Sequence, residues 1–330
     1  PYTEALNAEK LFPKYDDAKT VSADLITRLN ADIAKLDASA AGFTSSEDVV
    51  YKGSVSKWVK FANTLRMKLG MIVADENATA AKSAVEASDA GAIAASTDNG
   101  LFTYLSASPN QNPLHVDIVL GGRQDYIAAK DLMDKLAGWN DPRKTAYFST
   151  NNAGNYAGGI VGKVNTYVDF SRAGAKVIAA DAPYVLADYV ETEFLRAEAK
   201  ERGFNVAGTA EQHYNNAITA SILYWGGTAA EAAAYLAQPE VAYTTAAGNW
   251  KQKIGTQKWI ALYNRSYETW TELRRLDYPV ITAPVNAKSG FPTRLTYPNT
   301  EQTLNGTSYT AAAAAIGGDV VTTKLFWDKN

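Results

Sequence analysis

Three short motifs between residues 188 and 231 constrain the fold of this chain more than any other feature. They are Asp-Tyr-Val-Glu at 188–191, Thr-Ala-Glu-Gln at 209–212 and Thr-Ala-Ala-Glu at 228–231. In such a capping box the first side chain accepts from a backbone N–H three residues on, and the Glu or Gln bonds back to the first N–H. Gly203 and Gly226 follow the first two motifs, as expected where a helix ends in left-handed backbone. The motifs predict consecutive short helices that stack as helical hairpins.

Two further helices are predicted near the start of the chain, where apolar side chains recur every three or four residues. The first stripe is Val21, Leu25, Leu29, Ile33 and Leu36. The second stripe is Trp58, Phe61, Ala62, Leu65, Leu69, Ile72 and Val73. At this spacing we interpret Trp58 as a core residue rather than a ligand platform. We expect a mainly α chain of one domain, 1–330, with a helical scaffold at about 17–93 and 183–278.

The pattern changes between residues 94 and 182, where turn formers cluster and the helical period is lost except at about 125–136. The Asp141-Pro142-Arg143 triplet predicts a turn closed by a contact between the Arg and a carboxylate. The segment 279–330 is again rich in proline and glycine, which predicts a loop-rich end with a short helix at 311–315. We therefore expect long irregular insertions on the helical scaffold.

Aromatic and amide side chains alternate within 94–182, and this mixture suits sugar binding. Ring faces cover the apolar C–H faces of a pyranose, and amides bond its hydroxyls. Trp139 is the first candidate because it precedes a turn and lies outside every apolar stripe. The predicted ligand-binding residues are Trp139, Asn140, Arg143, Tyr147, Phe148, Asn151, Asn152 and Tyr156. An ordinary insertion packed on a helical scaffold would have the same composition.

Composition and motifs exclude several other functions. A net charge of −3 disfavours nucleic acid, and zero cysteines exclude disulfides and thiolate chemistry. No catalytic triad can be nominated, no EF-hand spacing or phosphate-binding loop occurs, and no apolar run is long enough to span a bilayer. Glu191 and Glu198 share a helical face, but Arg202 follows Glu198 by four residues and predicts an ion pair instead of a glycosidase site. We expect no metal and no cofactor, although the Asp/Asn loops leave calcium open.

The sequence from residue 258 to 279 carries a recognisable block of residues. It reads Lys-Trp at 258–259, Trp270, Arg-Arg at 274–275 and Tyr-Pro at 278–279. This block resembles that of the SusD/RagB family, the outer-membrane nutrient-binding lipoproteins of Bacteroidetes, and most closely a branch distant from the starch binder. Residues 188–203, 291–301 and 324–328 resemble further family motifs. The resemblance implies tetratricopeptide-like helical pairs, although no 34-residue repeat signature is found.

The resemblance also implies a function. Such a protein binds an oligosaccharide without catalysis, is held at the outer membrane by a lipid anchor absent from this chain, and serves a TonB-dependent SusC-type transporter. The alternative that we keep is a helical scaffold or a peptide- or glycoprotein-binding module without a sugar site, and an enzyme is a more distant third.

Two further expectations follow from the matched motifs. Residues 1–6 resemble an internal family motif, so we expect the chain to lack its natural start and these residues to lie against helices. We interpret Trp270 and the Arg274–Arg275 pair as structural, with a cost of about 3–5 kcal/mol for Trp270→Ala as a core truncation.

Overall fold

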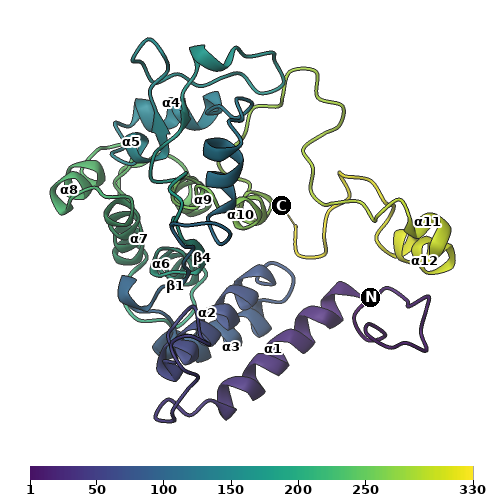
Figure 1. The fold of residues 1–330 in the computed structure, drawn as a ribbon. Coiled ribbons are helices and arrows are strands. Elements are labelled where there is room, and N and C mark those ends of the chain that lie inside the picture. The colour runs from purple at the N-terminus through teal and green to yellow at the C-terminus, as the bar shows by residue number, and fades with distance from the viewer. Residues whose placement is uncertain (330) are drawn as a thin grey trace.

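The computed structural model describes residues 1–329, and most of its regular structure is helical (Figure 1). The longer helices are α1 (Ala18–Lys35), α2 (Val55–Ile72), α3 (Ala78–Ser88), α4 (Lys130–Gly138), α6 (Tyr189–Glu201), α7 (Ala210–Tyr224), α8 (Ala229–Leu236), α9 (Trp250–Ala261), α10 (Ser266–Leu276) and α12 (Gly306–Ala315). The short elements are α5 (Lys144–Tyr147), α11 (Glu301–Leu304), the π-helix η3 (His115–Leu120) and the 3-10 turns η1 (Asp89–Gly91), η2 (Ser96–Asp98) and η4 (Tyr167–Asp169). The strands are β1 (Gly100–Phe102), β2 (Phe148–Ser149), β3 (Arg172–Ala173) and β4 (Tyr184–Ala187). Consecutive helices α2–α3, α6–α7 and α9–α10 pack in pairs, which confirms the predicted stack of helical hairpins.

The predicted capping residues begin the helices of the second half of the chain. The Asp188 carboxylate accepts from the Glu191 N–H at 2.9 Å, and the Thr209 hydroxyl accepts from the Gln212 N–H at 3.1 Å. The reciprocal bond of the capping box forms at Thr228, whose N–H donates to the Glu231 carboxylate at 2.7 Å. The same reciprocal bond was predicted for Glu191 and for Gln212, and both of these predictions are wrong. The Glu191 side chain is buried and pairs with cations instead.

The main core lies where α6 and α7 face α8 and α9. Val190, Phe194 and Ala197 of α6, whose spacings of four and three put them on one face, are all buried there. Tyr214 and Ile218 of α7, four residues apart, pack against them. Burial of an aliphatic or aromatic side chain of this size stabilises by about 1.5–3 kcal/mol, so this face alone holds the hairpin together.

The N-terminal helices are less buried than their stripes predicted. The side chains of the α1 stripe are half-buried at best, since α1 packs only at the edge of the stack against α2. On α2 the buried apolar residues are Met67 and Met71, together with Arg66, which donates to Ser88 at 2.8 Å. Trp58 is half-buried and packs edge-on against Tyr51 at 5.0 Å, so it is not the core residue that its spacing predicted. A polar side chain that has hydrogen-bond partners inside the protein can therefore lie on the inner face of a helix. The spacing of apolar residues alone does not predict this.

Residues 94–182 are irregular, as predicted. They contain the small antiparallel pair β2–β3 and the strand β1, which pairs with β4 just beyond this region. Helix α4 begins at Lys130, about five residues later than expected. Beyond Leu276 the chain is again mostly loop, with α12 longer than the short helix predicted there. Within residues 1–329 no helix combines the length and the hydropathy that a membrane crossing requires.

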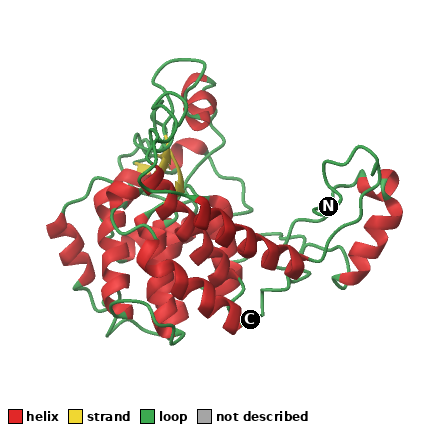
Figure 2. Cartoon of the chain, turned by 90° about the horizontal axis from the view of Figure 1, so that it is seen from below, coloured by secondary structure: helices red, strands yellow, loops and turns green. Residues whose placement is uncertain are grey.

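A small lobe projects from the helical body (Figures 1 and 2), where residues 1–16 lie beside α11 and α12. The Tyr15 hydroxyl donates to Glu301 at 2.8 Å, and its ring lies 4.6 Å from that of Tyr297. The expectation that residues 1–6 lie against helices holds for Tyr2, whose hydroxyl donates to Asp24 of α1 at 2.6 Å. It is wrong for Leu6, which is fully exposed.

Trp270 is structural, but it is not a core residue. Its ring is half-buried, its indole N–H donates to the Pro292 carbonyl at 2.8 Å, and the Arg274 guanidinium lies 3.8 Å from the ring centroid. Trp327 contacts the same guanidinium at 4.9 Å. The ring therefore holds the C-terminal segment to α10, and its truncation should destabilise less than the core value of about 3–5 kcal/mol.

We predict that the two helical halves unfold together, as expected if the chain forms the single domain predicted from the sequence. Lys68 of α2 and Glu191 of α6 form a buried ion pair at 3.0 Å, and Arg202 after α6 binds Asp75 after α2 at 2.7 Å. Urea unfolding followed by circular dichroism and by tryptophan fluorescence should give one coincident transition. Lys68→Met should lower the urea midpoints of both signals together. The expected loss in the free energy of unfolding is up to about 3 kcal/mol. Two separate transitions would show two independent units.

We also predict a pH-dependent stability centred on His213 in α7. Its Nδ1 lies 2.9 Å from a Glu193 carboxylate oxygen and its Nε2 lies 2.7 Å from the Ala207 carbonyl, so both nitrogens must donate and the ring is cationic. Burial and Arg196 lower the pKa of His213, but the bonds to Glu193 and Ala207 outweigh them and raise it above its usual value. A histidine whose pKa is higher in the folded state than in the unfolded state stabilises the fold. This stabilisation is complete at a pH below the unfolded-state pKa of about 6.5, and it is lost as the pH rises through the folded-state pKa.

Urea midpoints measured from pH 5 to 9 test this prediction. Across this pH range the free energy of unfolding of the wild type should fall by about 1.4 kcal/mol for each pH unit by which folding raises the pKa of His213. His213→Gln should remove this loss, while His115→Gln, at the other histidine of the chain, should keep it. An unchanged pH profile in His213→Gln would contradict the assignment.

Candidate functional site

Three of the eight predicted ligand-binding residues are buried in the protein. Arg143 is 1% exposed, and its guanidinium contacts the Asp141 carboxylate at 2.6 and 2.9 Å, which confirms the predicted turn. Tyr147 is 0% exposed and donates to the Ile260 carbonyl at 2.9 Å, and Phe148 packs in the same core cluster. A sugar on the surface cannot contact these side chains. For Arg143, Tyr147 and Phe148 the prediction is therefore corrected from ligand contact to structural support.

Trp139 ends α4 and is half-buried between two core clusters. The Lys135 ammonium lies 4.5 Å from its ring centroid and covers part of one face. The ring borders a cavity of about 350 Å³, which is also lined by Gln252 and Lys253. Asn140 is exposed in left-handed backbone with a φ of 47°. Trp139 and Asn140 thus lie at the surface beside a cavity, but Trp139 is not the freely exposed platform that its position suggested.

The remaining predicted residues lie on a separate loop. The Asn151 side chain accepts from the Asn155 N–H at 2.9 Å and donates to the Asp169 carbonyl at 2.8 Å, so it shapes the loop itself. Asn152 is exposed and accepts from Arg172, and Tyr156 is half-buried. The structure therefore does not bring the eight predicted residues together in one site.

A different cleft gathers aromatic and polar side chains from three segments distant in sequence. Its volume is about 280 Å³, and it lies between residues 176–185, the end of α7 and the α9–α10 connection. The side chains important here are Lys176, Tyr184, Tyr224, Trp225, Tyr263 and Asn264. We call this site the aromatic cleft. Only the 176–182 part of its lining belongs to the region from which a ligand site was predicted.

Local backbone signals place these rings at the ends of helices. Helix α7 ends at Tyr224, and Gly226 with a φ of 96° turns the chain directly after Trp225. Helix α9 ends at Ala261, and Asn264 with a φ of 65° turns the chain into α10. Glycine takes left-handed backbone without strain, and asparagine tolerates it better than most residues. The turns thereby present Tyr224, Trp225 and Asn264 at one end of the helical stack.

The rings of the aromatic cleft are held by each other and by the buried Tyr147. Tyr147 stacks on Tyr263 at 4.2 Å and meets Trp225 edge-on at 4.7 Å. The Lys176 ammonium lies 5.1 Å from the Tyr224 ring and 5.7 Å from the Trp225 ring, and burial lowers its pKa. Within residues 1–329 the indole N–H of Trp225 has no acceptor and is not buried. These rings form a fixed surface with polar groups at its edge.

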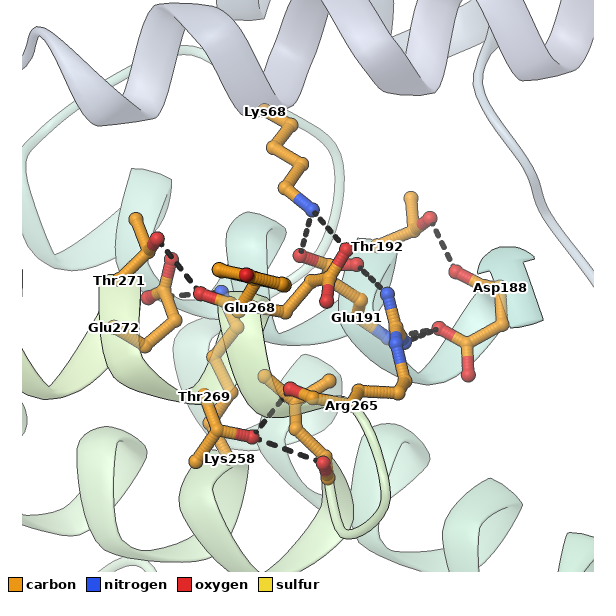
Figure 3. A network of polar contacts seen from close by, with 12 residues as sticks. Lys68, Asp188, Glu191, Thr192, Lys258, Arg265, Glu268, Thr269, Thr271 and Glu272 are labelled. Carbon is orange, nitrogen blue, oxygen red and sulfur yellow. Dashed lines mark hydrogen bonds and ion pairs between the residues drawn. The ribbon is translucent and has the colours of Figure 1, made fainter. Parts of the chain in front are cut away.

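Beneath the aromatic cleft lies a set of buried charges, drawn in Figure 3. Arg265 binds Asp188 at 3.1 Å and also Glu191, which pairs with Lys68 at 3.0 Å. Burial raises the pKa of Glu191, but Lys68, Arg265 and Lys258 outweigh it and hold that pKa well below its usual range. Burial raises the pKa of Asp188, and it outweighs the opposing effect of Arg265. Both carboxylates are bound by cations, so they support the structure.

Glu198, about two turns further along α6, is also buried and paired with cations. It pairs with Arg202 at 2.7 Å, as predicted, and with Arg275 at 2.6 Å. The predicted ion pair between Glu198 and Arg202 is therefore confirmed. Within residues 1–329 no three acidic or histidine side chains converge as metal ligands.

The outer wall of the aromatic cleft, residues 176–185, is anchored by a buried amide. The Asn112 side chain donates to the Ala182 carbonyl at 2.7 Å, and its backbone N–H donates to the Ala180 carbonyl at 2.7 Å. His115 at the start of the π-helix η3 lies 2.9 Å from the Ile178 carbonyl. A π-helix is rare and is found frequently beside functional sites. The wall is thus held in place by a specific polar contact.

Sequence reasoning missed the cleft because its rings had other interpretations. Trp225 follows Ile218 by seven residues and Ile222 by three, which is the spacing of a buried helical face, and Tyr263 lies within the recognised block at 258–279. The signal that could have identified them is the turn residue that follows each. Gly226 and Asn264 end the helical period, so the rings just before them lie at helix ends, where side chains can face solvent.

Comparisons with a family model and with solved structures indicate the same protein family. A SusD-like family model, described as starch-binding associating with outer membrane, matches residues 1–298. Two solved structures, a chitin-binding protein and a chitin-binding SusD homolog from Flavobacterium johnsoniae, are each 28% identical, with TM-scores of 0.85 and 0.88. A SusD homolog from Bacteroides uniformis is 27% identical with a TM-score of 0.89. All of this chain is covered in each case, against 76%, 76% and 77% of the respective solved chains. No curated protein is detectably similar in sequence.

We predict that Asn112 positions the wall of the aromatic cleft. Asn112→Ala leaves the Ala182 carbonyl without its donor and should destabilise the protein by about 1–3 kcal/mol. Hydrogen exchange of the peptide spanning 176–185 should become faster. Gln111→Ala removes a neighbouring amide that bonds Ser106 instead, and it should leave this exchange unchanged. Equal exchange in Asn112→Ala and wild type would contradict the anchoring role.

Proposed function

Because this chain belongs to the SusD-like family of starch-binding proteins associated with the outer membrane, we propose that it binds an oligosaccharide without cleaving it and delivers it to a TonB-dependent SusC-type transporter. The proposed location is the outer cell surface. Family membership supports glycan binding and outer-membrane association. Attachment through a lipid anchor and the transporter partner rest on the family resemblance.

The aromatic cleft is the site that best supports this proposal. Trp225 and Tyr224 supply ring faces that can cover the apolar face of a pyranose. The Asn264 amide and the Asp181 carboxylate, both on exposed residues at the cleft, can bond its hydroxyls. The rings are already fixed by contacts with Tyr147 and Tyr263, so little protein entropy is lost on binding.

Two ligand classes deserve to be compared first. The two solved structures at 28% identity are described as chitin-binding, which supports β-linked N-acetylglucosamine oligosaccharides. The family description names starch, which supports α-linked glucose oligosaccharides. We place chito-oligosaccharides first, because the structures that carry the chitin description cover this chain completely.

A non-catalytic role agrees with the contacts of the two buried acidic groups beside the aromatic cleft, Asp188 and Glu191. A glycosidase needs one carboxyl group that can give up a proton and a second that acts as base or nucleophile. Asp188 and Glu191 are instead engaged by Arg265, and Glu191 also by Lys68. The proposal therefore assigns these residues to the support of the cleft.

The cavity beside Trp139 stays a second candidate for the sugar site, because an indole ring and polar side chains border about 350 Å³ there. Asn140, the residue after Trp139, stays a predicted contact at this cavity. Asn151, Asn152 and Tyr156 stay predicted contacts for a glycan that extends over their loop. A peptide- or glycoprotein-binding module remains the alternative function. Peptide binding without binding of any free glycan would favour it.

Calorimetry with chitohexaose and maltohexaose tests the proposal. One sugar covers about half of a ring of roughly 200 Å², which at about 25 cal/mol per Å² gives an upper bound near 2.5 kcal/mol. Allowing for ordering and desolvation, we expect Trp225→Ala to weaken the bound hexasaccharide about tenfold. Asn264→Gly should also weaken it, since glycine keeps the left-handed turn and removes only the amide.

Circular dichroism on each variant separates lost binding from lost folding. If Trp139→Ala abolishes binding while Trp225→Ala does not, the sugar site is the Trp139 cavity. If the wild type binds neither hexasaccharide, the proposed ligand classes are wrong.

A further inference from the structure

Aromatic side chains continue outside the aromatic cleft along the small sheet at its rim. Tyr184 of β4 lines the cleft, and its cross-strand partner is Phe102 of β1. Directly opposite residues of an antiparallel pair present their side chains on the same face. Tyr104 meets Phe102 edge-on at 5.2 Å. Tyr184, Phe102 and Tyr104 therefore form one continuous row, which we call the aromatic strip.

The outer face of this sheet is unusually apolar for a surface. Tyr184 is 42% exposed and Phe102 is 37% exposed, while Val185 and Ala187 on the opposite face are buried. Within residues 1–329 the hydroxyls of Tyr184 and Tyr104 make no hydrogen bond. The aromatic strip thus offers ring faces together with free hydroxyls, which is the same combination that the aromatic cleft offers.

The size of the aromatic cleft indicates what would lie on the strip. A volume of about 280 Å³ falls just below the range of roughly 300–1,000 Å³ that ligand pockets usually occupy. An oligosaccharide of several units cannot be enclosed in it. Tyr184 belongs to both the cleft wall and the strip, so a chain that leaves the cleft on this side passes over Phe102 and Tyr104.

We propose that the aromatic strip of Tyr184, Phe102 and Tyr104 is a second subsite, which makes the protein select long oligosaccharides over short ones. This inference rests on the proposed glycan binding in the aromatic cleft. A disaccharide is held within the cleft, and a hexasaccharide also contacts the strip. Each additional covered ring removes apolar surface from water, so affinity increases with chain length until the strip is filled.

Affinities for chitobiose, chitohexaose, maltose and maltohexaose, measured by calorimetry, test this inference. For whichever series binds, the hexasaccharide should bind the wild type at least tenfold more tightly than the disaccharide. Phe102→Ala and Tyr104→Ala should each weaken the hexasaccharide about five- to tenfold and leave the disaccharide unchanged. Trp225→Ala should weaken both. Tyr126→Ala removes a comparably exposed aromatic side chain outside the strip and should change neither.

The outcomes separate the subsite from the site itself. Equal affinity of the wild type for both lengths, or an unchanged hexasaccharide affinity in Phe102→Ala and Tyr104→Ala, would overturn the subsite and leave glycan binding intact. Loss of both lengths in Phe102→Ala, with an unchanged circular dichroism spectrum, would place Phe102 in the primary site and also overturn it. If the wild type binds no sugar of either series, the proposed function fails and the subsite fails with it.

Discussion

Buried ion pairs between α6, α9 and α10 hold the arrangement on which the rest of the structure depends. Glu198 and Glu272 share Arg275, and Glu272 also binds Lys258 at 3.0 Å. All four of these side chains are almost completely inaccessible to water. Removing one partner of such a pair costs about 3–5 kcal/mol because the other charge stays buried without compensation. The helices are therefore fixed to one register, since any slide of α10 along α6 would separate these charges.

The same charges determine where the aromatic cleft lies. Arg265, the residue before α10, reaches Asp188 and Glu191 at the start of α6, and so docks the α9–α10 connection against that end of the stack. Tyr263 and Asn264 belong to this connection. The cleft is thus positioned by the electrostatic contacts directly beneath it, together with the packing of Trp225 and Tyr263 against the core cluster around Tyr147. This support allows half-buried aromatic side chains to border solvent on a stable scaffold.

The fold was more predictable than the site, and the reasons are physical. Helix caps and the Asp141–Arg143 turn depend on contacts within a few residues, so the local sequence determines them. Burial of Tyr147 depends on Ile260, more than a hundred residues later, and no local pattern contains that contact. Arg66 was unpredictable for the same reason, because its inner position requires Ser88 of α3. Trp225 shows the converse error, since apolar spacing up to a helix end does not reveal that the last ring is only half-buried and borders a cleft.

The supports of the aromatic cleft and of the aromatic strip differ, and this difference assigns them different tasks. Trp225 and Tyr263 are packed around the fully buried Tyr147, so their faces are fixed before a ligand arrives. Phe102 and Tyr184 stand on a two-stranded sheet of only three paired positions, and such a sheet depends on the body beneath it for its stability. A fixed site loses little entropy on binding and can hold one sugar in a defined orientation. The rings of the aromatic strip are less firmly supported, so they can adjust to different paths of the rest of the oligosaccharide. In the proposed site the aromatic cleft therefore orients the sugar, and the aromatic strip makes the affinity depend on oligosaccharide length.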